Sequence, residues 1–278
     1  MTTLNSVRAQ VNSLSGEVPS QLSTLTNLLT LELNENQFTG AIPPELCLLL
    51  KLKTLLLSEN SLSGLIPTCF GNFSRAQTFW LFDNHLSGSI PIELAFMSDL
   101  LYLELNGNYI TGSIPAKFEL LRSLEQLYLQ DNLLTGTLPS SLGAMTTIQH
   151  LVLEDNHVTG GIPHTFVNLT ALRYLLLGHN VLSQSLPAEL GALEQLIYLS
   201  APNNLFTGSI PLSFANLGQI EVLMLQGNKL TGSLGNVFSP KKQLQLHMID
   251  VSNNILSGDI PDEIFEVPQI ETLVLSGD

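Results

Sequence analysis

The chain has 278 residues, of which 44% are hydrophobic and 12% are charged, and its formal net charge is −14. This apolar content is enough to form a core and argues against disorder. The acidic balance argues against binding to nucleic acid or to an anionic membrane, because both need a basic surface. The acidic net charge favours a cationic partner, or a partner whose binding does not depend on charge.

The first residues lack the apolar segment of a signal peptide. No apolar run approaches the roughly 18 residues of a membrane span. We therefore expect a soluble segment that makes no membrane contact itself.

Asparagine recurs every 24 residues from Asn12 to Asn228 and then at Asn254. Glycine follows most of these asparagines by four residues, and proline follows most of them by seven. Such self-similarity indicates a stack of repeats. The asparagines that we assign to a structural ladder are Asn36, Asn60, Asn84, Asn108, Asn132, Asn156, Asn180, Asn204, Asn228 and Asn254.

The coil Leu124–Thr147 illustrates the local structure that the sequence of one repeat predicts. Leu127 and Leu129 alternate with outward residues, which is typical of a short strand with one buried face. Asn132 then turns the chain, and its amide can satisfy backbone groups because it carries both donors and an acceptor. We expect Leu134, Leu138, Leu142 and Met145 to fill the core, the last two from a helical or 3₁₀ return segment.

A single coil cannot bury its leucines, so the coils must stack. We count eleven coils of about 24 residues from Leu4 to Gln269, followed by a partial coil from Ile270 to Asp278, and we assign residues 1–278 to one repeat domain.

The pattern Leu-x-x-Leu-x-Leu-x-x-Asn-x-Leu-Thr/Ser-Gly-x-Ile-Pro, found along essentially the whole chain, resembles plant-type leucine-rich repeats. These occur in receptor-like ectodomains and in polygalacturonase-inhibiting proteins. The resemblance implies an α/β repeat solenoid, a right-handed superhelix with a parallel concave β-sheet and a 3₁₀ or helical convex side. It also implies extracellular recognition of a protein, peptide or glycan by a signalling or secreted glycoprotein.

The family usually closes both ends of the stack with paired cysteines, and this sequence lacks such caps. Uncapped repeats expose core leucines, so we expect a fragment of a longer protein that is extracellular or at the cell surface. Regularity breaks once, where the segment Phe238–Gln243 makes its coil two residues longer. This segment contains Lys241 and Lys242. This insertion is either a tolerated bulge or a loop that contacts a partner.

Strand residues that point away from the core carry four of the five tyrosines and the only tryptophan. Aromatic residues suit strands in general, but exposed ones also anchor interfaces. The residue just before each ladder asparagine forms an edge row rich in acids, which is either a solvated edge or a clamp for Lys and Arg side chains. The candidate ligand-binding residues of the concave face are Trp80, Phe82, Asp83, Tyr102, Glu104, Tyr128, Asp131, His150, Glu154, Asp155, Tyr174, His179 and Tyr198.

No pattern of catalytic, cofactor-binding or metal-binding residues emerges, so we predict neither an enzyme nor a cofactor. Cys47 and Cys69 lie in neighbouring coils two residues out of register, and whether they pair stays open. Asn72 and Asn168 begin glycosylation sequons at the same repeat position, on the convex return.

The predicted function is recognition of a ligand, a protein, peptide or glycan of basic character, through the concave face of a receptor-like or secreted protein. One alternative is an ice-binding or surface-binding solenoid, because Thr and Ser form ladders beside the repeat glycines. A second alternative is an intracellular scaffold.

Overall fold

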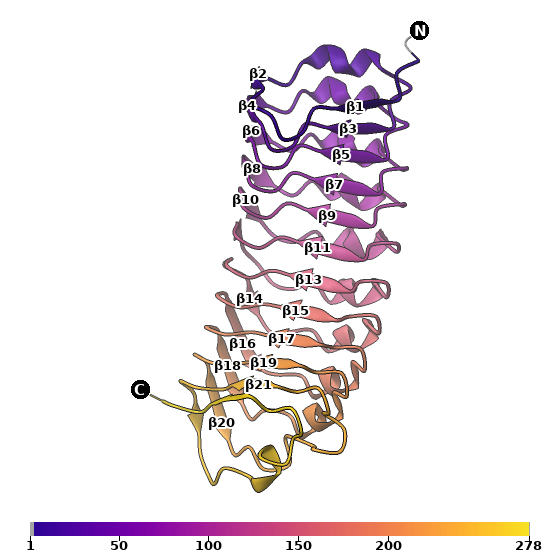
Figure 1. Cartoon of the computed structure of the whole chain (residues 1–278). Coiled ribbons are helices and arrows are strands. Elements are labelled where there is room, and N and C mark those ends of the chain that lie inside the picture. Colours follow the sequence, from indigo (N-terminus) through magenta and orange to yellow (C-terminus); the bar gives the residue numbers. More distant parts are fainter. Residues whose placement is uncertain (1–2, 278) are drawn as a thin grey trace. The chain divides into compact units, whose positions relative to one another are not determined.

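The computed structural model describes residues 3–277. Asp278, which the repeat places at the ladder position of the partial coil, lies outside them. The chain divides into two compact units, Met1–Thr135 (unit 1) and Gly136–Asp278 (unit 2), and each is described separately. Both have the predicted solenoid architecture, in which each coil contributes one strand to a parallel main sheet (Figure 1).

The main sheet of unit 1 contains six strands of three residues each. They pair in parallel and in chain order, and Leu31, Leu55 and Phe79 occupy the same place in successive strands. These central residues are fully buried. The strands are β1 (Ser6–Arg8), β3 (Thr30–Glu32), β5 (Thr54–Leu56), β7 (Thr78–Trp80), β9 (Tyr102–Glu104) and β11 (Gln126–Tyr128).

The main sheet of unit 2 repeats this plan. Its strands also run parallel in chain order, with Leu151, Leu175 and Leu199 in register and buried. The strands are β13 (His150–Val152), β15 (Tyr174–Leu176), β17 (Tyr198–Ser200), β19 (Val222–Met224), β21 (Met248–Asp250) and β23 (Thr272–Val274).

Each unit has a second parallel sheet, which the sequence analysis did not predict. It forms where the chain leaves the ladder asparagine and passes the Thr/Ser–Gly pair. In unit 1 it comprises β2 (Ser15–Glu17), β4 (Gln37–Ala41), β6 (Ser61–Leu65), β8 (His85–Ser89), β10 (Tyr109–Gly112) and β12 (Leu133–Leu134). In unit 2 it comprises β14 (Thr159–Gly160), β16 (Val181–Ser185), β18 (Leu205–Gly208), β20 (Lys229–Gly232) and β22 (Ile255–Leu256).

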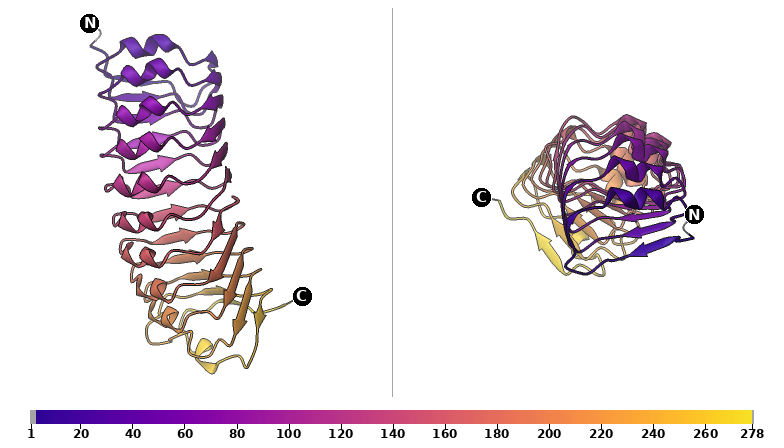
Figure 2. Two further views of the ribbon diagram at one scale, coloured as in Figure 1. Left: turned by 180° about the vertical axis from the view of Figure 1, so that it is seen from behind. Right: turned by 90° about the horizontal axis from the view of Figure 1, so that it is seen from above.

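The return segments of both units are 3₁₀ helices (Figure 2), except where the two-residue insertion lies in unit 2. Each helix begins directly after a repeat proline. Proline fixes φ near −65°, which favours this turn. They are η1 (Ser20–Thr24), η2 (Pro44–Leu48), η3 (Thr68–Asn72), η4 (Ile92–Phe96) and η5 (Ala116–Leu120) in unit 1, and η6 (Ser140–Ala144), η7 (His164–Asn168), η8 (Ala188–Ala192), η9 (Leu212–Asn216) and η10 (Asp262–Ile264) in unit 2. No helix among residues 3–277 is both long enough and apolar enough to cross a membrane.

The core residues predicted from the coil Leu124–Thr147 are all buried. Leu127, Leu129 and Leu134 are fully inaccessible, and Leu138, Leu142 and Met145 expose no more than 4% of their surface. The alternation of the strand and the spacing of the return segment therefore place the core correctly.

Within each unit, the asparagine ladder joins neighbouring coils. The two N–H groups of the Asn84 side chain are shared among the carbonyl oxygens of Leu57, Leu81 and Phe82, at 3.0 to 3.2 Å. Its Oδ1 accepts a hydrogen bond of 2.9 Å from the backbone N–H of Leu62. Leu57 and Leu62 belong to the preceding coil, so one side chain ties two coils together and satisfies buried backbone groups.

The ladder residues from Asn84 to Asn228 are buried, with exposures of 9% or less. Asn36, Asn60 and Asn254 are partly exposed but keep the same bonds.

Cys47 and Cys69 form a disulfide with a Cα–Cα distance of 5.8 Å. The pairing that the sequence left open is therefore made, between η2 and η3 of neighbouring coils. The two-residue offset does not prevent it, because adjacent 3₁₀ helices lie close enough for the usual Cα separation of a disulfide.

The two-residue insertion of unit 2 is a set of turns rather than a 3₁₀ helix. Gln243, which exposes only 2%, holds it by donating to the Phe214 carbonyl at 2.9 Å and accepting from the Ser239 N–H at 2.8 Å. Lys242 donates to Oδ1 of Asn216 at 2.6 Å.

We expect Asn132→Leu to destabilise the chain by roughly 1–3 kcal/mol, although it adds apolar volume, because it leaves buried backbone groups unsatisfied. Asn132 donates to the carbonyls of Leu105, Leu129 and Gln130 and accepts from the N–H of Ile110. The free energy of unfolding from urea titration measures the effect. Asn12→Leu is the matched control, because the Asn12 side chain makes only exposed bonds. Equal effects of the two substitutions would contradict the role assigned to the ladder.

Candidate functional site

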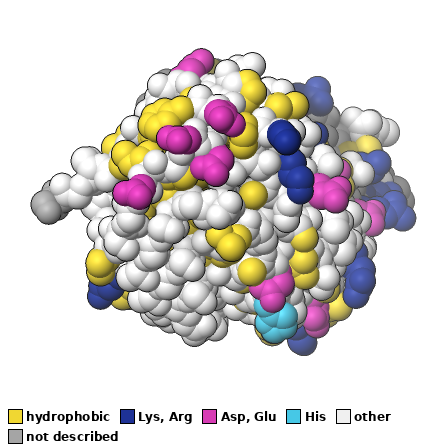
Figure 3. Space-filling model, turned by 90° about the horizontal axis from the view of Figure 1, so that it is seen from below, with side chains coloured by type: hydrophobic (Ala, Val, Ile, Leu, Met, Phe, Trp, Pro, Cys, Tyr) yellow, Lys and Arg dark blue, Asp and Glu magenta, His cyan; other side chains and the backbone are white. Residues whose placement is uncertain are grey.

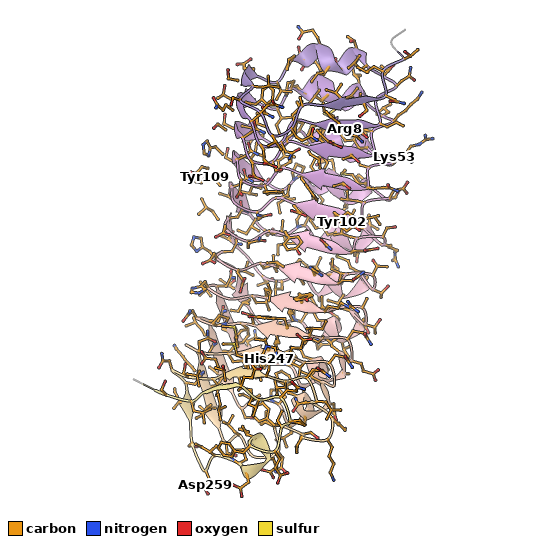
Figure 4. The ribbon with its side chains drawn as sticks, in the orientation of Figure 1. Arg8, Lys53, Tyr102, Tyr109, His247 and Asp259 are labelled. Carbon is orange, nitrogen blue, oxygen red and sulfur yellow. A yellow bond between two sulfur atoms is a disulfide. The ribbon has the colours of Figure 1, made fainter. Side chains whose placement is uncertain are left out.

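The outward side chains of the main sheet form a surface in each unit, which we call the main-sheet face; it is the surface predicted as concave. In each coil, the residue four positions before the ladder asparagine points outward. Strand register aligns these residues in one column that runs across the main-sheet face. In unit 1 this column brings Trp80, Glu104 and Tyr128 side by side on β7, β9 and β11. Tyr102 lies in the neighbouring column, and Figure 4 shows it on the main sheet while Tyr109 lies on the second sheet.

Trp80 and Phe82 provide an aromatic patch on the main-sheet face of unit 1. Their ring centroids are 5.9 Å apart and their planes are tilted by 54°. Both side chains are partly buried rather than fully solvent-facing. Neighbouring strands about 4.8 Å apart explain this, because large side chains on adjacent strands cover one another.

Glu104 lies between Trp80 and Tyr128, and this position changes its titration. Burial raises the pKa of the Glu104 carboxyl from 4.5 to about 7. The cause is desolvation, which disfavours the charged form. Glu104 is therefore an acid that changes charge near neutral pH on the main-sheet face of unit 1.

In unit 2 the same face carries a row of rings formed by His150, Tyr174 and Tyr198, which lie in register on β13, β15 and β17. The centroids of His150 and Tyr174 are 4.5 Å apart, and those of Tyr174 and Tyr198 are 6.4 Å apart. Burial, with a smaller contribution from Arg173, lowers the pKa of His150. Burial raises the pKa of Tyr198, and the Glu154 carboxylate adds to this.

A pocket of about 480 Å³ lies beside these rings on unit 2. It collects five of the predicted residues: Glu154, Asp155, Tyr174, His179 and Tyr198. It also has lining residues that the sequence analysis did not select, namely Leu176, Ser200, Pro202, Met224 and Gln226. They occupy the outward columns of the strands and could have been found from their positions, but none is aromatic or acidic.

Hydrogen bonds inside this pocket fix two side chains. The Ser200 hydroxyl donates to Oε1 of Glu154 at 3.2 Å, although the two residues are two coils apart. The Tyr198 hydroxyl lies 3.2 Å from the sulfur of Met224. The expectation that every residue of the outward columns faces solvent is wrong at several positions. The buried ones include Asn34, Ser58, Val152, Ser200, Pro202, Val222 and Ser252.

Gly178 makes room for the bond between Glu154 and Ser200. A Cβ added at Gly178 would lie 3.1 Å from Oε1 of Glu154 and 2.9 Å from Cγ of Pro202. A side chain at this position would therefore displace the carboxylate from the strand that it crosses.

The edge row has a backbone explanation that the sequence analysis lacked. Its residues adopt a left-handed conformation with φ between 50° and 67°, a region that Gly, Asn and Asp tolerate best. They include Asp83, Asp131 and Asp155 as well as His179, and these four are exposed. This backbone conformation accounts for the Asp, Asn and Gly residues of the row, although Glu35 and Glu59 adopt it too. The turn does not require a charge, since Asn203 and Gly227 occupy the same position.

Repulsion within the edge row is visible at Glu59. Partial burial raises the pKa of its carboxyl, and the neighbouring carboxylates of Glu35 and Asp83 raise it further. His179 departs from the row by placing its Nε2 3.2 Å from the amide nitrogen of Asn203.

Comparison with known proteins agrees with this architecture. A family model described as "Leucine rich repeat" matches residues 146–206, and a second model of the same description matches residues 27–49, 51–73 and 123–145. The chain is a plant-type leucine-rich-repeat protein. No curated protein sequence matches this repeat protein.

Several solved leucine-rich-repeat structures are similar to it. The crystal structure of a TDR receptor is 35% identical with a TM-score of 0.94, and the match covers 98% of this chain and 47% of that one. The Arabidopsis receptor kinase HAESA, in complex with the peptide hormone IDA and the co-receptor SERK1, is 30% identical with a TM-score of 0.91, covering 99% and 50%. The repeat protein therefore spans about half the length of these receptor chains.

A plant ice-binding protein is also similar to this leucine-rich-repeat protein, at 26% identity and a TM-score of 0.74. That match covers 90% of this chain and 82% of the other. Proteins of this repeat fold thus include both receptor kinases and an ice-binding protein, and the fold alone does not choose between these functions.

We expect Glu104→Gln to stabilise the protein at pH 8, by about 1 kcal/mol once solvent screening of the partly exposed group is allowed for. Because the folded pKa is about 7 and the unfolded value is 4.5, the folded state holds the proton longer, and stability falls as pH rises from 4.5 to 7. Urea unfolding at pH 4 and pH 8 measures the effect, which should vanish at pH 4. Exposed Glu194→Gln is the control, and a Glu104→Gln protein no more stable than wild type at pH 8 would refute the burial effect.

Proposed function

We propose that this repeat protein is the ligand-recognition module of a receptor-like or secreted extracellular protein, and that it binds a peptide or protein through the main-sheet face. The observation that carries the proposal is the pocket of unit 2, in which Tyr174 and Tyr198 lie beside Glu154. Tyrosine anchors with a polar neighbour are favoured at interfaces. The similarity to HAESA, which was solved with a peptide hormone, supports a peptide as the ligand.

The predicted residues of the main-sheet face form two candidate patches under this proposal. Unit 1 offers Trp80, Phe82, Asp83, Tyr102, Glu104, Tyr128 and Asp131, and unit 2 offers His150, Glu154, Asp155, Tyr174, His179 and Tyr198. The aromatic rings would supply most of the affinity. The acids would speed encounter with a basic ligand in a salt-dependent way. Recognition by this surface needs no catalytic step and no cofactor.

Charge supports a ligand with basic character. The chain carries 24 acidic and 10 basic residues. In the view from below, acidic side chains lie among hydrophobic ones, and Lys and Arg lie mainly toward one side (Figure 3). An acidic surface attracts cationic ligands and repels anionic ones.

Ice binding is the second candidate, and the similarity to a plant ice-binding protein favours it. Its surface would be the second sheet, where Thr39, Ser63, Ser87 and Thr111 repeat once per coil. Against it, the Thr39 and Ser87 hydroxyls each lie 3.4 Å from a glycine carbonyl of the preceding coil, and Tyr109 and Leu65 interrupt the face with exposures of 54% and 66%. Thermal hysteresis and faceting of ice crystals by the protein would establish this function, and their absence would remove it.

We also propose that Asn72 and Asn168 carry N-linked glycans. Both side chains are exposed at the ends of η3 and η7, away from the main sheet. Glycans there would leave the main-sheet face open. Mass spectrometry of the chain secreted from plant cells should show glycan at both positions, and unmodified peptides at both would reject the assignment.

We expect Tyr174→Ala and Tyr198→Ala each to weaken ligand binding at least tenfold, because each removes a partly buried ring from the pocket. The ligand is a peptide selected from a random twelve-residue display library against the whole chain, and the dissociation constant is measured by biolayer interferometry. Tyr109→Ala is the matched control, since it removes an exposed tyrosine from the second sheet, and it should change binding less than twofold. If Tyr109→Ala abolishes binding while the other two variants bind normally, the face has been misassigned.

A further inference from the structure

The pocket of unit 2 combines carboxylates with a wall of rings. Glu154 and Asp155 follow β13, Tyr174 and Tyr198 come from β15 and β17, and Met224 from β19 closes the far side. The volume of about 480 Å³ holds one large side chain with room for water.

The Glu154 carboxylate is held in place before any ligand arrives. Ser200, which exposes only 3%, donates to its Oε1, and the carboxylate lies over Gly178, where there is no side chain to displace it. A carboxylate has about four lone-pair sites and can accept from several donors at once. An acceptor fixed in this way loses little conformational entropy when a ligand binds.

The charges around the pocket are unbalanced toward the negative. No Lys or Arg is among the residues that line it, and His179 is its one basic side chain within the described part of the chain. His179 is exposed, and its Nε2 lies 3.2 Å from the amide nitrogen of Asn203. A cation entering the pocket therefore meets two carboxylates and two aromatic rings.

We propose that this pocket binds the guanidinium group of an arginine side chain of a peptide ligand, with Glu154 accepting its hydrogen bonds and Tyr198 or Tyr174 stacking against its plane. A planar guanidinium can bond a carboxylate with two parallel N–H groups and stack on an aromatic ring at the same time. An ammonium group is a compact point charge that offers neither the plane nor the fork. The inference rests on the proposed function and specifies which side chain that function selects.

The test uses three capped tripeptides and the whole chain: acetyl-Gly-Arg-Gly-amide, its lysine analogue, and its citrulline analogue, which has nearly the same shape without the charge. Binding is followed by NMR of the protein labelled at tyrosine. We expect the arginine probe to shift the Tyr174 and Tyr198 signals saturably, with a dissociation constant in the millimolar range. The lysine probe should bind several-fold more weakly and the citrulline probe at least tenfold more weakly.

Two variants separate the pocket from the rest of the surface. Glu154→Gln keeps the size of the side chain but removes its charge, so the preference for arginine over citrulline should fall at least tenfold, which corresponds to about 1.4 kcal/mol. Gly178→Ala retains the carboxylate but displaces it and should also reduce the preference. Glu194→Gln, an exposed carboxylate outside the pocket, should change nothing.

Citrulline binding as well as arginine, an unchanged preference in Glu154→Gln, or no shift of the Tyr174 and Tyr198 signals with any probe would each overturn the inference. The proposed function has its own test in the selected peptide ligand. A selected peptide that needs Tyr174 and Tyr198 but binds equally when its arginines are replaced by citrulline would leave the proposed function standing and remove this inference.

Discussion

The hydrogen bonds of the asparagine ladder are the interaction on which the rest of each unit depends. A tight turn follows the main-sheet strands, and the ladder side chain in that turn is buried from Asn84 to Asn228. Asn84 satisfies two carbonyls of its own coil and one carbonyl and one N–H of the coil before it. Because the Asn84 side chain reaches back by one coil, the same bonds that close the turn also set the stacking of neighbouring coils within the unit. Leucine supplies the apolar area, but the ladder makes its burial compatible with hydrogen bonding.

Because the structural roles fall on inward residues, the outward residues of the main-sheet face can vary. Core leucines and ladder asparagines occupy inward positions, so the outward positions of a strand carry few structural demands. The face of unit 2 uses that freedom to place Tyr174, Tyr198 and Glu154 together. One outward position is nevertheless constrained, because the residue before each asparagine adopts a left-handed conformation. Part of the acidic edge row is therefore a consequence of backbone geometry, whereas Glu154 lies outside that row and is not explained by it.

The fold could be predicted from the sequence because its determinants repeat. In one coil, Leu127 and Leu129 predict the strand and Asn132 predicts the turn. The other coils repeat the same pattern, so each supports the same prediction. The second sheets were missed because their Thr/Ser–Gly segments lack the alternation of apolar residues that marks a strand. The Cys47–Cys69 disulfide could not be decided, because spacing alone does not say how closely two return segments approach.

The site could be predicted only in part, for a similar reason. Column positions identified Tyr174, Tyr198 and Glu154, since aromatic and acidic residues stand out on a strand. They could not show that Glu154 crosses over Gly178 to bond Ser200 two coils away. That contact depends on the lengths and directions of individual side chains, which a repeat pattern does not contain. Partial burial of the rings likewise depends on the particular neighbours on adjacent strands.

The central claim is that recognition takes place on the main-sheet face, and photo-crosslinking tests it most directly. A peptide selected against the whole chain is made with a benzophenone group replacing one residue at a time, irradiated in the complex, and located by mass spectrometry of the digested protein. The account predicts adducts on outward residues of the main-sheet strands and the turns after them, such as Met224 and Gln226 beside the pocket. Adducts confined to the second sheets or to the 3₁₀ helices would contradict it.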